Sequence, residues 1–337
     1  MNGRAMREPA FWWRSAGISS ALLAPLALVY GTIAGLRLAK TGWPPKIPVL
    51  CVGNFTLGGA GKTPTAIMLA RMIADTGERP FFLSRGYGGT MSGPWLVNAR
   101  SDVAAQVGDE PLLLAGIAPV VVARDRVAGA KFASTHGATV VVMDDGLQNP
   151  SLAKDFTVAV VDAWRGIGNS RVFPAGPLRA PLAVQLAKTD ALLVVGEGGG
   201  ADDVVSEARL RDLPILRGHL VPDPIAVAAL KKYKALAFAG IGDPEKFFNT
   251  ARSAGIAVTE CQAFPDHHCY TSEDARNLIM QADRAGLILL TTEKDRARIA
   301  GEPSLEGLAA RAHELPVTMV VDEPDALRRL VTAKLRR

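Results

Sequence analysis

The sequence has few cysteines and no long run of basic residues. Its three cysteines are Cys51, Cys261 and Cys269, an odd number without the paired spacing of metal ligands, so neither a disulfide framework nor a zinc cage is indicated. The formal net charge of +5 is modest for 337 residues, and without five or six basic residues in succession it gives no reason to expect nucleic acid as a partner. We expect a protein of a reducing compartment, and the composition indicates no obligate protein partner.

The N-terminal region lacks charge over a long stretch. From Ser15 to Leu36 no residue is charged, and a helix of this length is about 33 Å long, close to the thickness of a bilayer's hydrocarbon core. Trp12 and Trp13 at one edge are typical of interfacial anchors. Pro25 weakens the case for a full span, so a helix that crosses the bilayer and one that lies in the interface both stay open. The stretch predicts contact with a membrane.

A glycine-rich turn separates a predicted strand from a predicted helix near residue 60. The apolar run Ile47–Val52 leads into this turn, and apolar residues at helical spacing follow from Thr65 to Thr76. Such a turn aims several backbone N–H groups at one point, where the helix dipole also favours an anion. We therefore expect the phosphates of a nucleotide to bind here.

Individual residues of the turn have distinct expected roles. The expected nucleotide-binding residues are Thr56, Gly58, Gly59, Ala60, Gly61, Lys62 and Thr63. Lys62 would reach the β- and γ-phosphates and stabilise charge during transfer, and the Thr63 hydroxyl would hold Mg²⁺. The turn is a variant of G-x-x-x-x-G-K-[ST], because Thr56 stands at the position of the first glycine.

An acidic motif follows a later apolar run. Ala138–Met143 is rich in valine and ends in Asp144-Asp145-Gly146. A buried parallel strand that ends in carboxylates would place them beside the metal held by Thr63, as an enzyme that uses a magnesium nucleotide requires. We expect Asp144 and Asp145 to serve Mg²⁺.

Three further turns have both functional and structural interpretations. Arg85 follows the predicted strand Pro80–Ser84, and in open α/β sheets the carboxyl ends of strands hold the ligand, although a surface arginine would look the same. Asp109 and Glu110 precede an apolar segment, where they are either catalytic or an N-terminal helix cap. His267 begins a His-His-Cys sequence that suits a catalytic histidine, a polar loop or, less well, a metal site.

The length and the order of predicted elements indicate two α/β units behind the apolar segment. We predict a membrane-associated segment at residues 1–40, a P-loop domain at 41–230 and a smaller α/β domain at 231–337. The expected fold class is a parallel sheet like that of P-loop NTPases, with a second, smaller α/β domain and an N-terminal apolar membrane helix.

Taken in order, the motifs resemble the tetraacyldisaccharide 4'-kinases of lipid A biosynthesis. The motifs that carry the resemblance are Gly58-Gly59-Ala60-Gly61-Lys62-Thr63-Pro64, Ser84-Arg85-Gly86-Tyr87-Gly88, Gly108-Asp109-Glu110-Pro111, Asp144-Asp145-Gly146, Pro174-Ala175-Gly176, Phe264-Pro265-Asp266-His267 and Thr291-Thr292-Glu293-Lys294-Asp295. They extend from the apolar N-terminal segment to about residue 298.

The resemblance implies a membrane-bound kinase. It implies transfer of a phosphoryl group from ATP to the 4'-hydroxyl of tetraacyldisaccharide 1-phosphate, which forms lipid IVA at the cytoplasmic face of the inner membrane. It places a base on Asp109, paired with His267. The nucleotide and its Mg²⁺ would be served by Lys62, Thr63, Glu110, Asp144 and Asp145. We expect Arg85 and Tyr87 to contact the glycolipid substrate.

The sequence departs from the family's commonest pattern in two places. Leu147-Gln148-Asn149 stands where Phe-Gln-His is usual, which leaves open the contact that the histidine would make. Pro177 stands where many members have arginine.

Two other classes of protein share parts of the pattern. A membrane-associated partition-type ATPase also has Gly-Gly-x-Gly-Lys-Thr, but it places a lysine where this chain has Leu57. A nucleotide-gated binding module without transfer chemistry is the second alternative.

Overall fold

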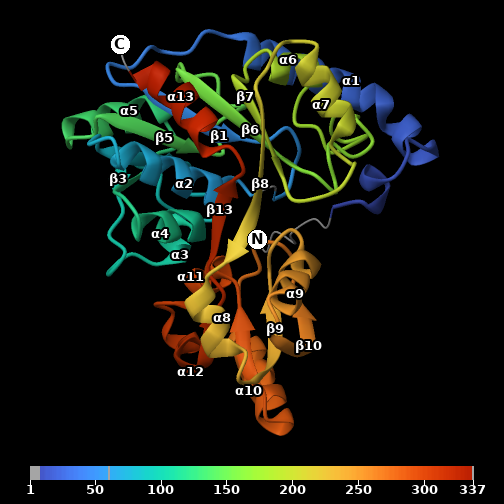
Figure 1. Cartoon of the computed structure of the whole chain (residues 1–337), viewed down its shortest axis with the longest axis vertical. Coiled ribbons are helices and arrows are strands. Elements are labelled where there is room, and N and C mark those ends of the chain that lie inside the picture. The colour runs from blue at the N-terminus through green and yellow to red at the C-terminus, as the bar shows by residue number, and fades with distance from the viewer. Residues whose placement is uncertain (1–7, 60, 336–337) are drawn as a thin grey trace.

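The chain forms two sheets that lie one beyond the other (Figure 1). The computed structural model describes residues 8–59 and 61–335. The larger sheet has nine strands in the order β13-β8-β7-β6-β1-β5-β2-β4-β3, and the smaller has four in the order β10-β9-β11-β12. The predicted α/β class, with a parallel sheet and a second, smaller α/β unit, is confirmed.

The larger sheet is parallel except at its two edges. Its strands are β1 (Val49–Gly53), β2 (Pro80–Ser84), β3 (Trp95–Leu96), β4 (Val120–Val122), β5 (Val140–Asp144), β6 (Phe156–Asp162), β7 (Ala191–Val195), β8 (Ile215–Pro222) and β13 (Val317–Val321). Only β3 and β13 pair antiparallel to their neighbours. The parallel strands therefore end at one edge, where the loops after β1, β2, β4 and β5 come together.

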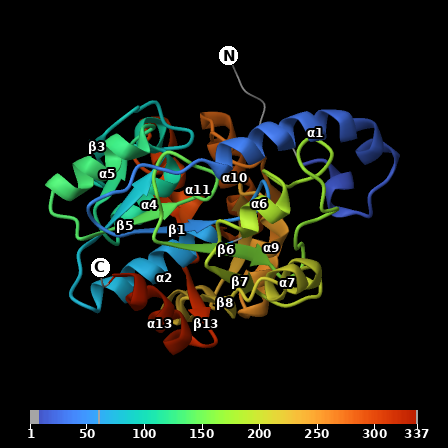
Figure 2. The same cartoon turned by 90° about the horizontal axis from the view of Figure 1, so that it is seen from above.

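Helices cover both faces of this sheet, as its alternating side chains require. Leu50 and Val52 of β1 are buried against α2 (Lys62–Ala74), whereas Val49 and Cys51 are buried on the face of α5 (Arg126–Thr135). Figure 2 shows α2 and α13 on one side of the strands and α5 and α1 on the other. The remaining helices of this unit are α3 (Ala104–Val107), α4 (Asp109–Ala115), α6 (Leu182–Leu186), α7 (Asp202–Arg209) and α13 (Pro324–Leu335). Because both faces are covered, the central strands are almost wholly apolar.

The smaller sheet lies beyond the carboxyl edge of the larger one (Figure 1). Its strands and helices are α8 (Pro224–Leu230), β9 (Lys234–Ala239), α9 (Pro244–Ser253), β10 (Ala257–Ala263), α10 (Ser272–Ala285), β11 (Ile288–Thr291), α11 (Glu293–Ile299), η2 (Pro303–Leu305), α12 (Glu306–Arg311) and β12 (Ala312–Glu314). All four strands are parallel.

The predicted division at residue 231 places the whole C-terminal part of the chain in the smaller unit. The sheet topology instead places the last strand and helix in the larger unit. β13 pairs with β8, and Met319, Val321, Leu327 and Val331 are buried in the core of the larger unit. Residues 317–335 therefore pack with the larger unit, where β13 covers the free edge of β8. The strand β8 (Ile215–Pro222) ends only a few residues before that predicted division.

The apolar N-terminal helix lies along the larger unit rather than apart from it. After η1 (Ala10–Trp13), α1 (Ile18–Ala39) packs beside α6. Ser20 donates a hydrogen bond to the Ala175 carbonyl at 2.8 Å, and Gly31 approaches Val172 closely. By its length and composition the helix could span a membrane, and most of its apolar side chains face outward.

Candidate active site

The predicted phosphate loop connects β1 to α2. Gly61 has φ of +87°, a conformation that glycine adopts at little cost, and Lys62 begins the helix directly after it. Asn54 Nδ2 donates to the Gly58 carbonyl at 3.0 Å, and Leu57 N donates to the Pro177 carbonyl at 2.9 Å. These bonds fix the loop on both sides. Ala60, which was also predicted to contact nucleotide, lies outside the described residues.

The Lys62 side chain lies inside the loop. Its Nζ donates to the Gly58 carbonyl at 3.1 Å and is 3.8 Å from Asp145 Oδ2. Burial lowers the pKa of Lys62, and the Asp145 carboxylate opposes that shift. A buried ammonium at the start of a helix is well placed to bind phosphate oxygens.

Thr63 and Asp144 form the part of the site that suits a metal ion. Thr63 Oγ1 donates to Asp144 Oδ2 at 3.1 Å, and Asp144 Oδ1 is buried without a hydrogen-bond partner. Burial, together with the Glu110 carboxylate, raises the pKa of Asp144 to about 7. An unpartnered carboxylate oxygen beside a hydroxyl fits Mg²⁺, which would favour the ionised form.

The rest of the predicted metal set has cationic partners. Asp145, at φ of +53°, receives hydrogen bonds from both terminal nitrogens of Arg179: Nη1 donates to Oδ1 at 2.9 Å and to Oδ2 at 3.1 Å, and Nη2 donates to Oδ2 at 3.1 Å. Glu110 Oε1 is 2.6 Å from Lys294 Nζ. Among residues 8–59 and 61–335, no three His, Cys, Asp or Glu side chains form a metal-binding group. Mg²⁺ does not require one, because it is commonly held by one or two carboxylates together with substrate phosphates and water.

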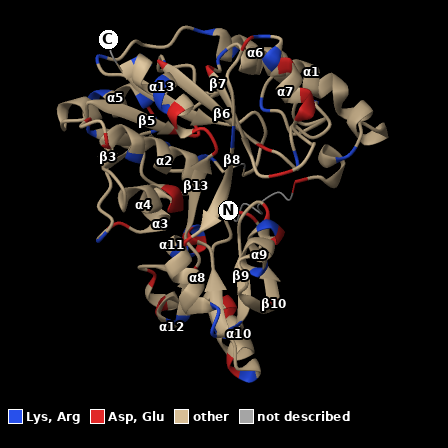
Figure 3. Ribbon diagram, in the orientation of Figure 1, with Lys and Arg blue, Asp and Glu red and all other residues tan. Residues whose placement is uncertain are grey.

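Asp109 and His267 come together from the two units. Asp109 begins α4, and its Oδ2 lies 3.6 Å from His267 Nδ1 and 2.6 Å from Arg298 Nη2. Hydrogen bonding to His267 and the charge of Arg298 outweigh burial, so the pKa of Asp109 lies well below its usual range. Figure 3 colours the start of α4 red, where Asp109 and Glu110 face Arg298 and Lys294 on α11.

The predicted substrate residues lie near this cluster but differ in their contacts. The Tyr87 and His267 rings are 4.9 Å apart between centroids, and Tyr87 is exposed. Arg85 is exposed and makes no hydrogen bond or ion pair with the described part of the chain.

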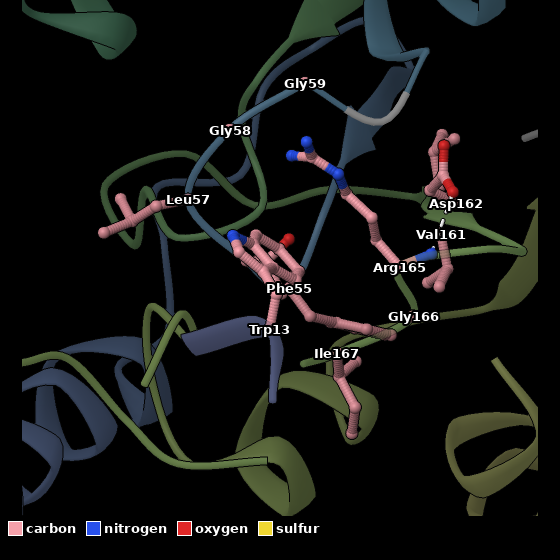
Figure 4. Close-up of a pocket in the computed structure, with 12 residues that line it drawn as sticks. Trp13, Phe55, Leu57, Gly58, Gly59, Val161, Asp162, Arg165, Gly166 and Ile167 are labelled. Atoms are coloured by element: carbon pink, nitrogen blue, oxygen red, sulfur yellow. Dashed lines mark hydrogen bonds between the residues drawn. The ribbon is translucent and has the colours of Figure 1, made fainter. Parts of the chain in front are cut away.

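A narrow pocket lies against the other side of the phosphate loop (Figure 4). Glu8 of the N-terminal segment lies against the same loop, because a side chain at Gly58 would overlap with its Oε1. Glu8 Oε2 accepts hydrogen bonds from Trp13 at 3.0 Å and from Arg165 at 3.2 Å, and Arg165 also pairs with Asp243 at 3.0 Å. These contacts tie the N-terminal segment and the smaller unit to the phosphate loop.

Sequence reasoning missed four residues of the site. They are Arg179, Lys294, Arg298 and Glu8. Lys294 lies within a motif that carried the resemblance, and Arg179 follows another by three residues. Arg298 and Glu8 lie in no such motif, and only the fold brings them to the site.

Asn149 supports a local turn. Its Oδ1 accepts hydrogen bonds from Ser151 N at 3.0 Å and Ser151 Oγ at 2.7 Å. The neighbouring Gln148 donates to the Asn54 carbonyl at 2.7 Å and accepts from Arg179 at 3.2 Å. The link from this segment to the phosphate loop therefore runs through Gln148.

The geometry defines a class of protein: a P-loop phosphotransferase whose phosphate loop faces a second, smaller domain. The family model described as tetraacyldisaccharide-1-P 4'-kinase matches residues 19–336. The chain belongs to that family, which confirms the resemblance seen in its motifs.

Individual relatives agree with this assignment. The chain is 51% identical over 332 residues to a tetraacyldisaccharide 4'-kinase from Rhodopseudomonas palustris strain BisB5, with 98% of each chain covered. A second such kinase, from strain BisA53, is 52% identical over 330 residues and covers 98% of this chain and 96% of its own. The crystal structure of LpxK from Aquifex aeolicus in complex with ATP is 26% identical with a TM-score of 0.73, and covers 94% of this chain and 99% of that one.

Proposed function

We propose that this protein transfers the γ-phosphoryl group of ATP to the 4'-hydroxyl of tetraacyldisaccharide 1-phosphate, forming lipid IVA. One observation carries the proposal beyond family membership. The helix α4, which begins with Asp109 and Glu110, packs beside α2, which begins with Lys62 of the phosphate loop. This packing, together with the Glu110 charge that acts on Asp144, supports a single site made of the phosphate loop and the Asp109 cluster. Donor and acceptor can therefore meet between the two units.

The nucleotide side of the site binds and orients the triphosphate. The backbone N–H groups at the start of α2 and the Lys62 ammonium bind its phosphate oxygens. Thr63 and Asp144 would hold Mg²⁺, with Asp145 and Glu110 around it. When bound, Mg²⁺ offsets the negative charge on the phosphates during transfer. Arg179 holds Asp145 in place through the hydrogen bonds that its guanidinium donates to both carboxylate oxygens.

The acceptor side handles the proton of the attacking hydroxyl. Arg298 and His267 both face Asp109 Oδ2, whereas Oδ1 makes no hydrogen bond to the described residues. Oδ1 is therefore available to accept a hydrogen bond from the 4'-hydroxyl. The charge of Arg298 makes the Asp109 carboxylate a weak base. His267 therefore shares the proton taken from the 4'-hydroxyl, and Asp109 and His267 act as one unit.

The apolar N-terminal helix brings this site to the membrane. Ile18, Leu22, Leu28 and Leu36 of α1 are exposed, while the opposite side packs on α6 and the Phe173–Gly176 loop. Because α1 packs along the protein on one side and exposes apolar side chains on the other, we expect it to lie in the membrane interface rather than to cross the bilayer. We place the enzyme at the cytoplasmic face of the inner membrane, where ATP and the glycolipid headgroup are both available.

Acceptor-dependent turnover tests the proposed function. Purified protein is incubated with ATP, Mg²⁺ and tetraacyldisaccharide 1-phosphate, and both ADP release and the mass of the lipid are measured. We expect ADP only with the acceptor, and a lipid product heavier by one phosphate group on the 4'-oxygen. ADP release without the acceptor would favour a partition-type ATPase, and binding of ATP without turnover would favour a gated binding module.

A further inference from the structure

A fully buried glutamine lies behind the phosphate loop. Gln185 belongs to α6, the short helix that packs beside α1. Its Nε2 donates to the Phe55 carbonyl at 3.2 Å and to the Ala180 carbonyl at 2.7 Å, and its Oε1 accepts from Gln148 Nε2 at 2.8 Å. Both N–H groups and the carbonyl of this amide are therefore paired, which offsets the cost of burying it.

Gln148 continues the hydrogen bonds from Gln185 toward the acidic motif. Its Nε2 also donates to the Asn54 carbonyl at 2.7 Å, and its Oε1 accepts from Arg179 Nη1 at 3.2 Å. A guanidinium only donates hydrogen bonds, so Arg179 fixes which end of the Gln148 amide faces it, and Gln148 in turn fixes the amide of Gln185. A buried network in which every polar group is paired is rigid.

The three side chains of this network hold three successive carbonyl groups at the entry to the phosphate loop. Arg179 Nε donates to the Thr56 carbonyl at 2.8 Å, next to the Asn54 and Phe55 carbonyls that the two glutamines bind. The Phe55 carbonyl already accepts from Arg179 N at 2.9 Å, so the bond from Gln185 is not needed to satisfy a buried acceptor. This additional bond restricts where the carbonyl, and with it the loop, can lie.

The network ends beside Lys62 along two branches. On one branch, the Arg179 guanidinium donates to both oxygens of Asp145, whose Oδ2 is 3.8 Å from Lys62 Nζ. On the other, Asn54 Nδ2 donates at 3.0 Å to the Gly58 carbonyl, which also accepts from Lys62 Nζ at 3.1 Å. The network therefore fixes both groups that Lys62 contacts.

We propose that Gln185, acting through Gln148 and Arg179, positions the phosphate loop and the carboxylate beside it for the magnesium nucleotide, an inference that rests on the proposed function. Gln185 is fully buried and contacts neither substrate, so it acts only by restricting the residues that do. Loss of its amide should weaken binding of the nucleotide. It should leave binding of the acceptor unchanged, because Asp109 begins a different helix, α4.

Equilibrium binding of Mg·ADP tests this inference without the acceptor lipid. Isothermal titration calorimetry gives the Kd for the wild type, Gln185→Met, Gln148→Met and the double variant, with circular dichroism to establish that each protein is folded. Methionine has the length of glutamine but lacks its amide. Gln148→Met lies at a half-buried position and breaks the same network without a change in the closed core.

Thr189→Val is the matched control. Thr189 is buried, and its Oγ1 donates to the backbone carbonyl of Gln185 at 2.9 Å. The substitution removes a buried hydrogen bond at the end of the same helix and keeps the Gln185 amide.

We expect Gln185→Met to raise the Kd for Mg·ADP about tenfold, the lower end of the loss typical of residues behind a metal site, and Thr189→Val to leave it unchanged. The double variant should bind scarcely more weakly than Gln148→Met alone, because that change already breaks the network. Effects that multiply would overturn the inference. An unchanged Kd in folded Gln185→Met or Gln148→Met would also overturn it, as would an equal loss in Thr189→Val.

Steady-state kinetics separate positioning from a general loss of folded protein. We expect Gln185→Met to raise the KM for ATP and to leave the KM for tetraacyldisaccharide 1-phosphate unchanged. A lowered kcat with both KM values unchanged would assign Gln185 a merely structural role and would overturn the inference. A wild type that binds Mg·ADP but phosphorylates no lipid would instead contradict the proposed function, and calorimetry would still decide the inference.

Discussion

Arg298 Nη2 lies 2.6 Å from Asp109 Oδ2, in a buried ion pair that joins α11 of the smaller unit to α4 of the larger. Arg298 also donates to Asp295 at 2.7 Å, so one guanidinium neutralises two buried carboxylates. His267 Nδ1 lies 3.6 Å from the same oxygen of Asp109. The orientation of the proposed base therefore depends on contacts between the two units.

Removal of the proposed base should strongly lower turnover. We expect Asp109→Ala and His267→Ala each to lower kcat by about 10²- to 10⁴-fold with ATP affinity largely kept, the usual cost of losing a general base. Because the two residues act as one unit, the double variant should be scarcely worse than the more damaged single one. Single-turnover kinetics on all four proteins measure this. Losses that multiply would contradict the paired model, and a near-normal kcat in Asp109→Ala would move the base to Asp144 or Asp145.

Loss of the Arg298 guanidinium should destabilise the protein. Arg298→Met removes the guanidinium that pairs with the buried carboxylates of Asp109 and Asp295, and breaking a buried ion pair in this way costs about 3 to 5 kcal/mol. Urea unfolding measures the difference. Arg311→Met is the matched control, because Arg311 pairs with Asp283 at an exposed position and such pairs contribute about 1 kcal/mol or less. Equal losses in the two variants would contradict the structural role given to Arg298.

The metal site should depend on Thr63 and Asp144. Chelation of Mg²⁺ should abolish transfer, and Thr63→Ala or Asp144→Asn should raise the Mg²⁺ concentration for half-maximal activity at least about tenfold, an effect typical of altered metal sites. Asp75→Asn, at the exposed end of α2, is the control. An unchanged Mg²⁺ requirement in both site variants would place the metal elsewhere.

The outward face of α1 should determine membrane binding. Leu22, which is 76% exposed, and Leu26, which is 61% exposed, lie on that face. Each change to glutamate should weaken binding to anionic lipid vesicles by about tenfold or more, since it removes about 1.5 to 3 kcal/mol of apolar burial. Met280→Glu, on α10 of the smaller unit, should have no such effect. Unchanged sedimentation of the Leu22 and Leu26 variants with vesicles would show that another surface binds lipid.

The parts of the fold that the sequence predicted are those set by local patterns. The turn from Gly53 to Lys62 and the run that ends at Asp144 combine strong periodicity with residues that chemistry constrains, so both motifs fall where they were expected. The contact between the two motifs, through Thr63 and Asp144, could be predicted because parallel strands carry their ligand-binding loops at the same edge of the sheet.

The rest depended on contacts between distant parts of the chain. The return of β13 to β8 is a pairing across about one hundred residues, and no local pattern distinguishes it from a strand of the smaller sheet. Arg298 and Glu8 likewise reach the site only through the packing of α11 and of the N-terminal segment. The cationic partners of Glu110 and Asp145 could not be read from residue types, because each pair joins residues far apart in sequence.

The most direct test follows the γ-phosphoryl group itself. Transfer of label from [γ-³²P]ATP to tetraacyldisaccharide 1-phosphate is measured for the wild type and for Lys62→Ala, with circular dichroism to establish that the variant is folded. We predict label in the lipid with the wild type and none above background with the variant, because Lys62 stabilises the charge on the phosphates during transfer. Full transfer by a folded Lys62→Ala protein, or no label in lipid with the wild type, would contradict a kinase built on this phosphate loop.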